Sequence, residues 1–161
     1  MTVGRLVQLT LAALLLGGCV VSTPFAGPGY DPATQRADVD EAQVVLSLTQ
    51  AVLKDDSQAR AAFWDYVEVV EASLPERRGF IGFSKRTELF GSNAWTMTVW
   101  SDAASLDAFV DSTPHRAAMQ AAMGALVDAR FARVSIDRRE LPVSWERALE
   151  LLERNGRHYY E

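Results

Sequence analysis

The 161-residue chain is poor in the side chains that most often carry chemistry. It has one cysteine, Cys19, and two histidines, His115 and His158. A single cysteine excludes an intramolecular disulfide and a cysteine-rich zinc site. No cluster of histidine and carboxylate residues has metal-ligand spacing, so we expect no metal site. A glycine-rich phosphate loop, a Gly-x-Ser-x-Gly elbow and a dinucleotide fingerprint are missing as well, and we therefore expect no cofactor.

Concentrated positive charge is also missing. The formal net charge is -5, and the 16 lysine and arginine residues are spread along the chain. Nucleic-acid binding needs a basic patch that neutralises phosphates, so we expect no nucleic-acid partner. Long apolar runs are absent too, because the run at residues 6–16 is shorter than the roughly 20 residues that a membrane-spanning helix needs.

The chain begins in the manner of an export signal. Arg5 precedes the apolar run, which ends in Leu16-Gly17-Gly18-Cys19, and this layout is typical of a secretory signal peptide. The four residues Leu16-Gly17-Gly18-Cys19 resemble the lipobox of bacterial lipoproteins. That resemblance implies a signal peptide over 1–18, an acylated Cys19 that anchors the protein in a lipid membrane, and a place in the bacterial cell envelope, facing the periplasm or the exterior. The alternative is an ordinary signal peptide with a chance cysteine.

Residues 19–41 have the composition of a linker. They include Ser22-Thr23-Pro24 and Ala26-Gly27-Pro28-Gly29 and show little apolar periodicity. We expect a flexible tether that spans roughly 25 Å on average. The remaining residues, 42–161, are one domain's worth of chain.

Hydrophobic spacing within that domain predicts alternating strands and helices. Strands are expected at 43–53, 79–89, 93–100 and 130–139, and helices at 57–74, 102–109, 113–128 and from Ser144 to Gly156. The order is β-α-β-β-α-β followed by a helix, which predicts an α+β fold with a ferredoxin-like unit. The strands at 43–53 and 93–100 carry apolar groups on both faces. A second copy of the sheet is the simplest cover, so we expect a homodimer.

Residues from about 43 to 140 resemble an antibiotic-biosynthesis-monooxygenase domain, and the clearest matches fall in the second half of that domain. The resemblance is carried by Thr98-Val99-Trp100, Ser105-Leu106, Phe109, Ser112-Thr113-Pro114-His115 and Met119. It implies a dimeric α/β-barrel, in which two ferredoxin-like units join sheet to sheet. The superfamily includes cofactor-free quinone-forming oxygenases, haem-degrading oxygenases and isomerases.

Two patterns of that family can be compared residue by residue. Haem-degrading members place a tryptophan where this chain has Phe109 and the haem-ligating histidine where it has Met119, so haem degradation is not expected. Many members carry a histidine pair at the positions of Phe109 and His115, and only the second histidine is present here.

His115 is the candidate catalytic residue. It follows the helix start Thr113-Pro114, where the helix dipole disfavours protonation, so a neutral imidazole could accept a proton from a phenolic substrate. The alternative is a polar residue that closes the helix start. Trp64, Trp100, Phe109 and Met119 are candidate ligand-binding residues for a flat aromatic molecule, and packing in the core or a dimer seam is the competing role for the aromatic rings.

Two functions remain open at this point. The first is a cofactor-independent monooxygenase that acts on an aromatic or quinone-like small molecule. The second is a non-catalytic lipoprotein module that binds an apolar ligand or a protein partner. The family resemblance favours the first function, whereas the missing histidine at position 109 favours the second.

Overall fold

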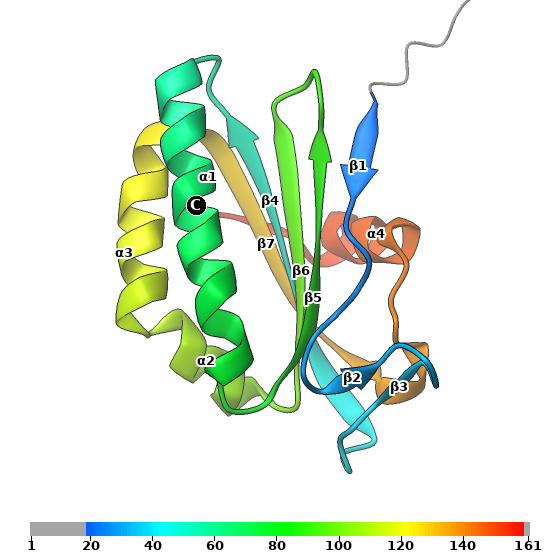
Figure 1. Cartoon of the computed structure of the whole chain (residues 1–161). Helices are drawn as coiled ribbons and strands as arrows, with labels where there is room; N and C mark the ends of the chain where they lie inside the picture. The colour runs from blue at the N-terminus through cyan, green and yellow to red at the C-terminus, as the bar shows by residue number, and fades with distance from the viewer. Residues whose placement is uncertain (1–18, 160–161) are drawn as a thin grey trace, which may run out of the picture.

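The computed structural model describes residues 19–159, and the predicted signal peptide lies outside this range. The described residues form a six-stranded antiparallel sheet in the order β1-β5-β6-β4-β7-β8, shown in Figure 1. Its strands are β1 (Val20–Ser22), β4 (Gln43–Leu53), β5 (Phe80–Glu88), β6 (Asn93–Trp100), β7 (Leu126–Asp137) and β8 (Arg157–His158). Two further short strands, β2 (Tyr30–Asp31) and β3 (Arg36–Ala37), pair with each other.

The predicted ferredoxin-like unit is confirmed. Its elements follow one another as β4, α1 (Ser57–Ser73), β5, β6, the pair α2 (Ala103–Val110) and α3 (Thr113–Ala122), and β7; α4 (Trp145–Asn155) comes last. The central strands stand in the order β5-β6-β4-β7, which is the ferredoxin-like arrangement. Polar caps start α2 and α4: Asp102 accepts from the Ser105 amide at 2.7 Å, and Ser144 accepts from the Arg147 amide at 3.2 Å.

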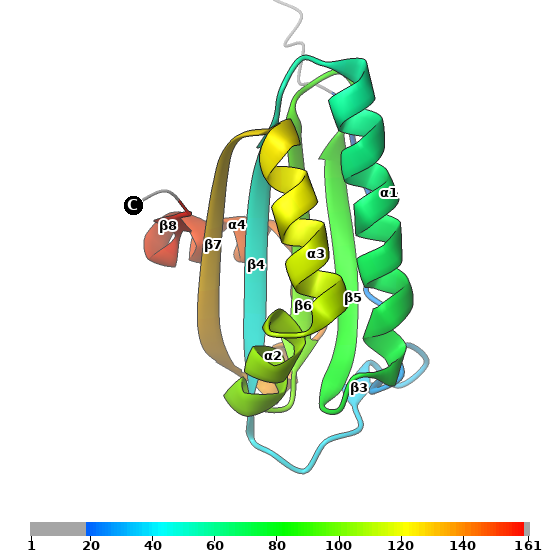
Figure 2. The same ribbon diagram turned by 90° about the vertical axis from the view of Figure 1, so that its left-hand side faces the viewer.

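Helices α1, α2 and α3 cover one face of the sheet. The predicted stripe of α1 supplies Phe63, which is buried against β4 and β7 residues, and it leads to buried Leu74 just beyond the helix. Figure 2 shows that α1 and α3 lie in front of β5, β6 and β4, whereas β7 stands clear of both helices. On β7, the side chains of Val127 and Phe131 are exposed.

The boundary between α3 and β7 differs from the prediction. The helix ends at Ala122, a short 3₁₀ turn spans Met123–Ala125, and β7 begins at Leu126, so the predicted helix over 113–128 is too long. Leu126 and Ala129 of β7 are buried in a cluster with Phe63 of α1. This packing overrides the helical propensity of the alanine-rich segment. The helix begins at Thr113 as predicted, and Ser112 is the residue at its N-cap.

The second face of the sheet is covered by the chain itself. Leu151 and Leu152 of α4 and Tyr30 of β2 pack with buried side chains of β4, β5, β6 and β7 in one apolar cluster. Trp145 at the start of α4 donates its indole N–H to Ser84 Oγ at 3.0 Å. The sequence pattern suggested a second copy of the sheet as the simplest cover, whereas α4 and the segment around Tyr30 cover this face within one chain. Local patterns do not show which distant segment fills an apolar surface.

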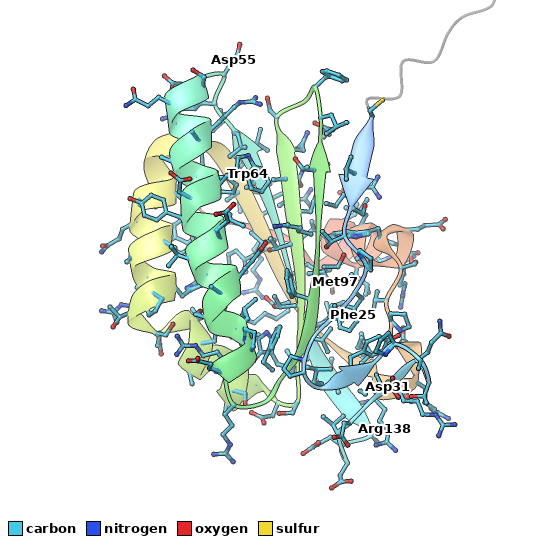
Figure 3. The ribbon with its side chains drawn as sticks, viewed as in Figure 1. Phe25, Asp31, Asp55, Trp64, Met97 and Arg138 are labelled. Carbon is cyan, nitrogen blue, oxygen red and sulfur yellow. The ribbon has the colours of Figure 1, made fainter. Side chains whose placement is uncertain are left out.

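The flexible tether predicted over 19–41 is also corrected. The amide of Ala26 donates to the carbonyl of Phe83 at 3.0 Å, and the amide of Phe83 donates back at 2.8 Å. Phe25 contacts Tyr30 edge to face at 5.0 Å on the side of the sheet away from Trp64, as Figure 3 shows. A Cβ on Gly27 would lie 2.3 Å from the Cα of Gly82. The glycine that suggested a linker instead permits close approach of two backbones.

No helix within residues 19–159 is long and apolar enough to cross a membrane.

Candidate functional site

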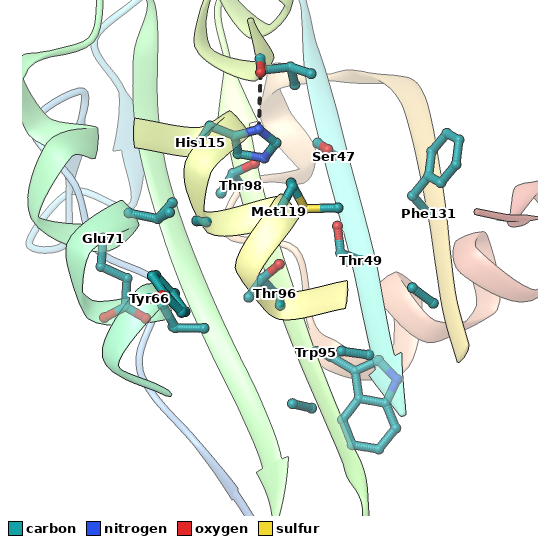
Figure 4. A pocket seen from close by; sticks show the side chains of 18 of the residues that line it. Ser47, Thr49, Tyr66, Glu71, Trp95, Thr96, Thr98, His115, Met119 and Phe131 are labelled. Carbon is teal, nitrogen blue, oxygen red and sulfur yellow. Dashed lines mark hydrogen bonds between the residues drawn. The ribbon is translucent and has the colours of Figure 1, made fainter. Parts of the chain in front are cut away.

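A cavity of about 370 Å³ lies between the sheet and the layer formed by α1 and α3. Its size falls in the range of roughly 300–1,000 Å³ that is usual for small-molecule sites. Figure 4 shows part of its lining, in which polar side chains stand among apolar walls. The lining residues that matter below are Ser47, Thr49, Trp64, Glu71, Thr96, Thr98, Phe109, His115, Met119 and Phe131.

Four hydroxyl groups form the floor of the cavity. Ser47 and Thr49 of β4 are paired across the strands with Thr98 and Thr96 of β6, respectively. Side chains of directly paired residues point to the same face of a sheet, so the four hydroxyls make a small polar square. Sequence reasoning missed this hydroxyl square. A signal was available, because serine or threonine occupies alternate positions on one face of both strands.

His115 lies above this floor, in the first turn of α3. Its Nδ1 lies 3.0 Å from the carbonyl oxygen of Val110, the contact drawn as a dashed line in Figure 4. A carbonyl oxygen only accepts, so in the neutral ring Nδ1 carries the proton and donates it. The other nitrogen, Nε2, is then an unprotonated acceptor on a ring that lines the cavity.

The surroundings favour the neutral imidazole. Burial lowers the pKa of His115 below its ordinary value, and the nearby positive charge of Arg133 lowers this pKa further, against the opposing effect of the Val110 carbonyl. Arg133 itself forms an ion pair with Asp107. The ring therefore stays available as a hydrogen-bond or proton acceptor at neutral pH.

A chain of contacts fixes the position of His115. Its ring meets Phe109 edge to face at 4.7 Å, Phe109 stacks on Trp100 at 4.9 Å, and the indole N–H of Trp100 donates to Thr98 Oγ1 at 3.0 Å. Because Thr98 accepts this bond, its own hydroxyl hydrogen is free to donate into the cavity. One acceptor, His115, and one donor, Thr98, thus belong to the same packed unit.

The other predicted site residues divide into two groups. Trp64, Phe109 and Met119 line the cavity together with His115. Trp100 does not line it, because its ring is fully buried among Leu74, Phe80 and Leu106. The predicted ligand contact of Trp100 is corrected on this ground: it supports Phe109 and Thr98 from behind. The side chain of a residue at the end of a strand can point to either face of the sheet. For Trp100, only the packing of α2 determines the direction.

A second acceptor lies on the α1 side of the cavity. Oε2 of Glu71 pairs with Lys85 Nζ at 2.8 Å, while Oε1 of the same carboxylate is buried and has no partner among the described residues. A buried acceptor without a partner is costly unless a ligand or water supplies a donor. Glu71 lines the cavity because β5 approaches α1 here and supplies Lys85 as its partner.

Within the described part of the chain, no group of three or more histidine, cysteine and acidic residues is placed to hold a metal ion. The cavity therefore offers hydrogen-bond acceptors, hydroxyl donors and aromatic walls. This combination suits a flat, largely apolar molecule with hydroxyl groups at its edge.

Comparisons with known proteins bear on the fold. No family model matches this chain, and no curated protein matches it in sequence. Among solved structures, a conserved protein from Methanosarcina mazei Go1 matches with a TM-score of 0.51 and 13% identity, over 60% of this chain and 94% of that one. The fold is ferredoxin-like.

Two other similar structures have TM-scores below 0.5. A dimeric ferredoxin-like protein of unknown function from Jannaschia sp. CCS1 has a TM-score of 0.48 and 14% identity, over 58% of this chain and 98% of that one. A candidate antibiotic biosynthesis monooxygenase from Nitrosomonas europaea has a TM-score of 0.49 and 9% identity, over 61% of this chain and 90% of that one. Likeness at these identities concerns the fold and leaves activity to be argued from the site.

Proposed function

We propose that this protein binds a flat, hydroxylated aromatic molecule in the cavity and oxidises it with molecular oxygen, without a cofactor. The observation that carries the proposal is the geometry of His115. Its proton sits on the nitrogen that faces Val110, so the nitrogen left for the ligand is a base. The resemblance to quinone-forming oxygenases supports the same reaction class.

The chemistry requires a base and a donor. Nε2 of His115 would take the acidic proton of the substrate, and the hydroxyl of Thr98 would stabilise the negative charge that develops on the substrate oxygen. The carbanion then reacts with oxygen and loses water to form a quinone. For anthrone the balance is anthrone plus O₂ giving anthraquinone plus water.

The test follows oxygen uptake and quinone absorbance with anthrone as the probe. We expect turnover above the spontaneous rate, and His115→Gln should lower kcat by about 100-fold or more. The matched control is His158→Gln, which removes the exposed histidine that pairs with Asp128 at 3.0 Å. That control should keep the native rate.

A second candidate function is ligand binding without turnover. The specific observation in its favour is the partner of His115, since Val110 supplies a carbonyl where a carboxylate would have strengthened the base. One titration distinguishes the two functions. If the native chain binds the aromatic probe tightly but takes up oxygen no faster than the His115→Gln variant does, the cavity serves binding alone.

We further propose that the protein is exported and held in the cell envelope, facing the periplasm or the exterior, by acylation of Cys19. The Leu16-Gly17-Gly18-Cys19 sequence supports this. Cys19 is also exposed and makes no disulfide, so its thiol is accessible. An aromatic ligand that dissolves in the membrane would be close to such an anchored domain.

For the assembly, we propose a homodimer that meets at β7, beside the cavity. The second sheet face is occupied by α4 and by residues 25–39, so two sheets cannot join there. Three exposed apolar side chains on β7 and just before it form what we call the mouth patch: Met123, Val127 and Phe131. Phe131 also lines the cavity, so a partner at the mouth patch would close it to water.

A further inference from the structure

We propose that one end of the molecule inserts apolar side chains into a phospholipid bilayer, next to Cys19. We call this surface the apolar tip. It consists of the first two residues of β1 and two residues of the turn between β5 and β6: Val20, Val21, Leu89 and Phe90. The inference rests on the anchoring proposed above and concerns how the domain then stands on the membrane.

The apolar tip is exposed to an unusual degree. The relative exposure of Phe90 is 87% and that of Leu89 is 55%, while Val21 is 49% and Val20 is 38% exposed. Single exposed apolar residues are common, but four that meet at one end indicate an interaction surface. The pairing of β1 with β5 brings them to the same end: the amide of Leu89 donates to the carbonyl of Cys19 at 2.9 Å, and Val20 is paired with Glu88.

Hydrogen bonds within the protein hold the turn that presents these side chains. Arg60 donates to the carbonyl of Gly91 at 3.0 Å and to Ser92 Oγ at 2.9 Å. The carboxylate of Glu88 accepts from the amide of Asn93 at 3.1 Å and from its side chain at 3.0 Å. Polar groups that already have partners lower the cost of bringing the turn into an apolar medium.

The chain that precedes the structure reaches the domain at this same end. The apolar run at residues 6–16 leads to Cys19, and β1 starts at the very next residue. The flexible tether expected from the sequence does not separate them. Acyl chains on Cys19 would therefore bring Leu89 and its neighbours to the membrane surface.

The charge pattern fits a zwitterionic membrane as well as an anionic one. The residues of the apolar tip are uncharged, and both signs of charge lie next to them: Arg60 and Glu88 at the turn and Asp55 at the same end of the molecule, as Figure 3 shows. The contact is accordingly apolar, and we expect it not to depend on anionic lipid.

The test uses the full chain with a second cysteine. In an acylated protein the sulfur of Cys19 is consumed, so Phe90→Cys would carry the only free thiol and can be labelled with a polarity-sensitive fluorophore. The matched control is Val69→Cys. Val69 is also exposed. It lies about 18 Å along α1 from Ser57, the first residue of that helix, which follows Asp55 at the end of the molecule that holds the apolar tip.

Both proteins are placed in vesicles of phosphatidylcholine and, separately, of phosphatidylethanolamine with phosphatidylglycerol. We expect the label at 90 to shift to shorter wavelength, to brighten several-fold and to be quenched by nitroxide lipids in both vesicles. The label at 69 should keep the spectrum of a label in water. Intact mass and a single labelled thiol establish acylation beforehand.

The outcomes are distinct. Two reactive thiols in the chain would mean that Cys19 is not acylated, and the anchoring proposal would fail. An acylated chain whose label at 90 is as exposed to water as the label at 69 would overturn the apolar tip alone. Shielding at 90 that lipid-borne quenchers do not affect would place a protein segment or a second copy on the tip, and would overturn it as well.

Discussion

At the scale of single residues, position changes the meaning of a side chain. His115 is a candidate base because the carbonyl of Val110 holds its other nitrogen and because the surrounding residues bury the ring. Trp100, which looks equally available in the sequence, is buried behind Phe109. Similar reasoning applies to Glu71, which lines the cavity and has one buried carboxylate oxygen without a partner among the described residues.

The lowered pKa of His115 predicts a pH effect on stability. The folded protein binds a proton at this ring less readily than the unfolded chain does. The contribution to the free energy of unfolding is therefore fully present at high pH and is lost as the pH falls below about 6.5. Urea unfolding at about pH 7.5 and about pH 5 should show a larger loss for the native chain than for His115→Gln.

Carboxylates with a lowered pKa, such as Asp102 and Glu88, also contribute less to the free energy of unfolding as the pH falls. They do so equally in the native protein and in the variant. The comparison between the two chains thus isolates the histidine. Equal losses in the native protein and the variant would show that burial of His115 does not oppose its protonation.

At the scale of elements, α4 and the segment that carries Phe25 and Tyr30 replace a partner sheet. They cover the face that apolar residues of β4 and β6 expose, and the bonds from Trp145 to Ser84 and from Ser84 to the carbonyl of Thr23 (2.7 Å) link the two covers through β5. The fold therefore completes its second core within one chain.

Removing a contact of α4 should be costly in consequence. Leu152 is buried in this second core, and Leu152→Ala should lower the free energy of unfolding by about 2–5 kcal/mol. Glu146→Ala, on the exposed side of the same helix, should change it by less than about 0.5 kcal/mol. Chemical unfolding measures both. A loss at Leu152 no greater than the loss at Glu146 would mean that α4 does not cover the sheet in solution.

At the scale of the whole molecule, the two faces of the sheet have different tasks. One face holds the second core, and the other, which α1 and α3 cover in Figure 2, holds the cavity. The apolar tip and Cys19 lie at one end of the strands. Membrane contact, cavity and internal core thus occupy separate surfaces.

The mouth patch predicts the state of association. We expect the chain without residues 1–18 to sediment as a dimer at micromolar concentration. Val127→Asp and Phe131→Ser together should shift it to the monomer, because they place charge and polarity where apolar contact is proposed. Val69→Ser, which changes an exposed residue of α1, serves as the control. A native chain that sediments as a monomer would contradict the dimer.

Much of the fold follows from the sequence. Period-two alternation placed β4 and β6 at their observed ends, and the capping residues Asp102 and Ser144 marked the starts of α2 and α4 correctly. These features depend on residues close together in the chain, so local physical chemistry determines them. The placement of His115 in the first turn of a helix belongs to the same class.

Only the tertiary structure decided which distant segments meet. It set residues 20–29 against β5, where the missing side chain of Gly27 allows close approach, and it closed the second sheet face with α4. It also brought the hydroxyls of β4 and β6 together beneath His115. Composition and periodicity show that a surface is apolar or polar, but they do not show its partner, because that choice depends on shape and packing across the whole chain.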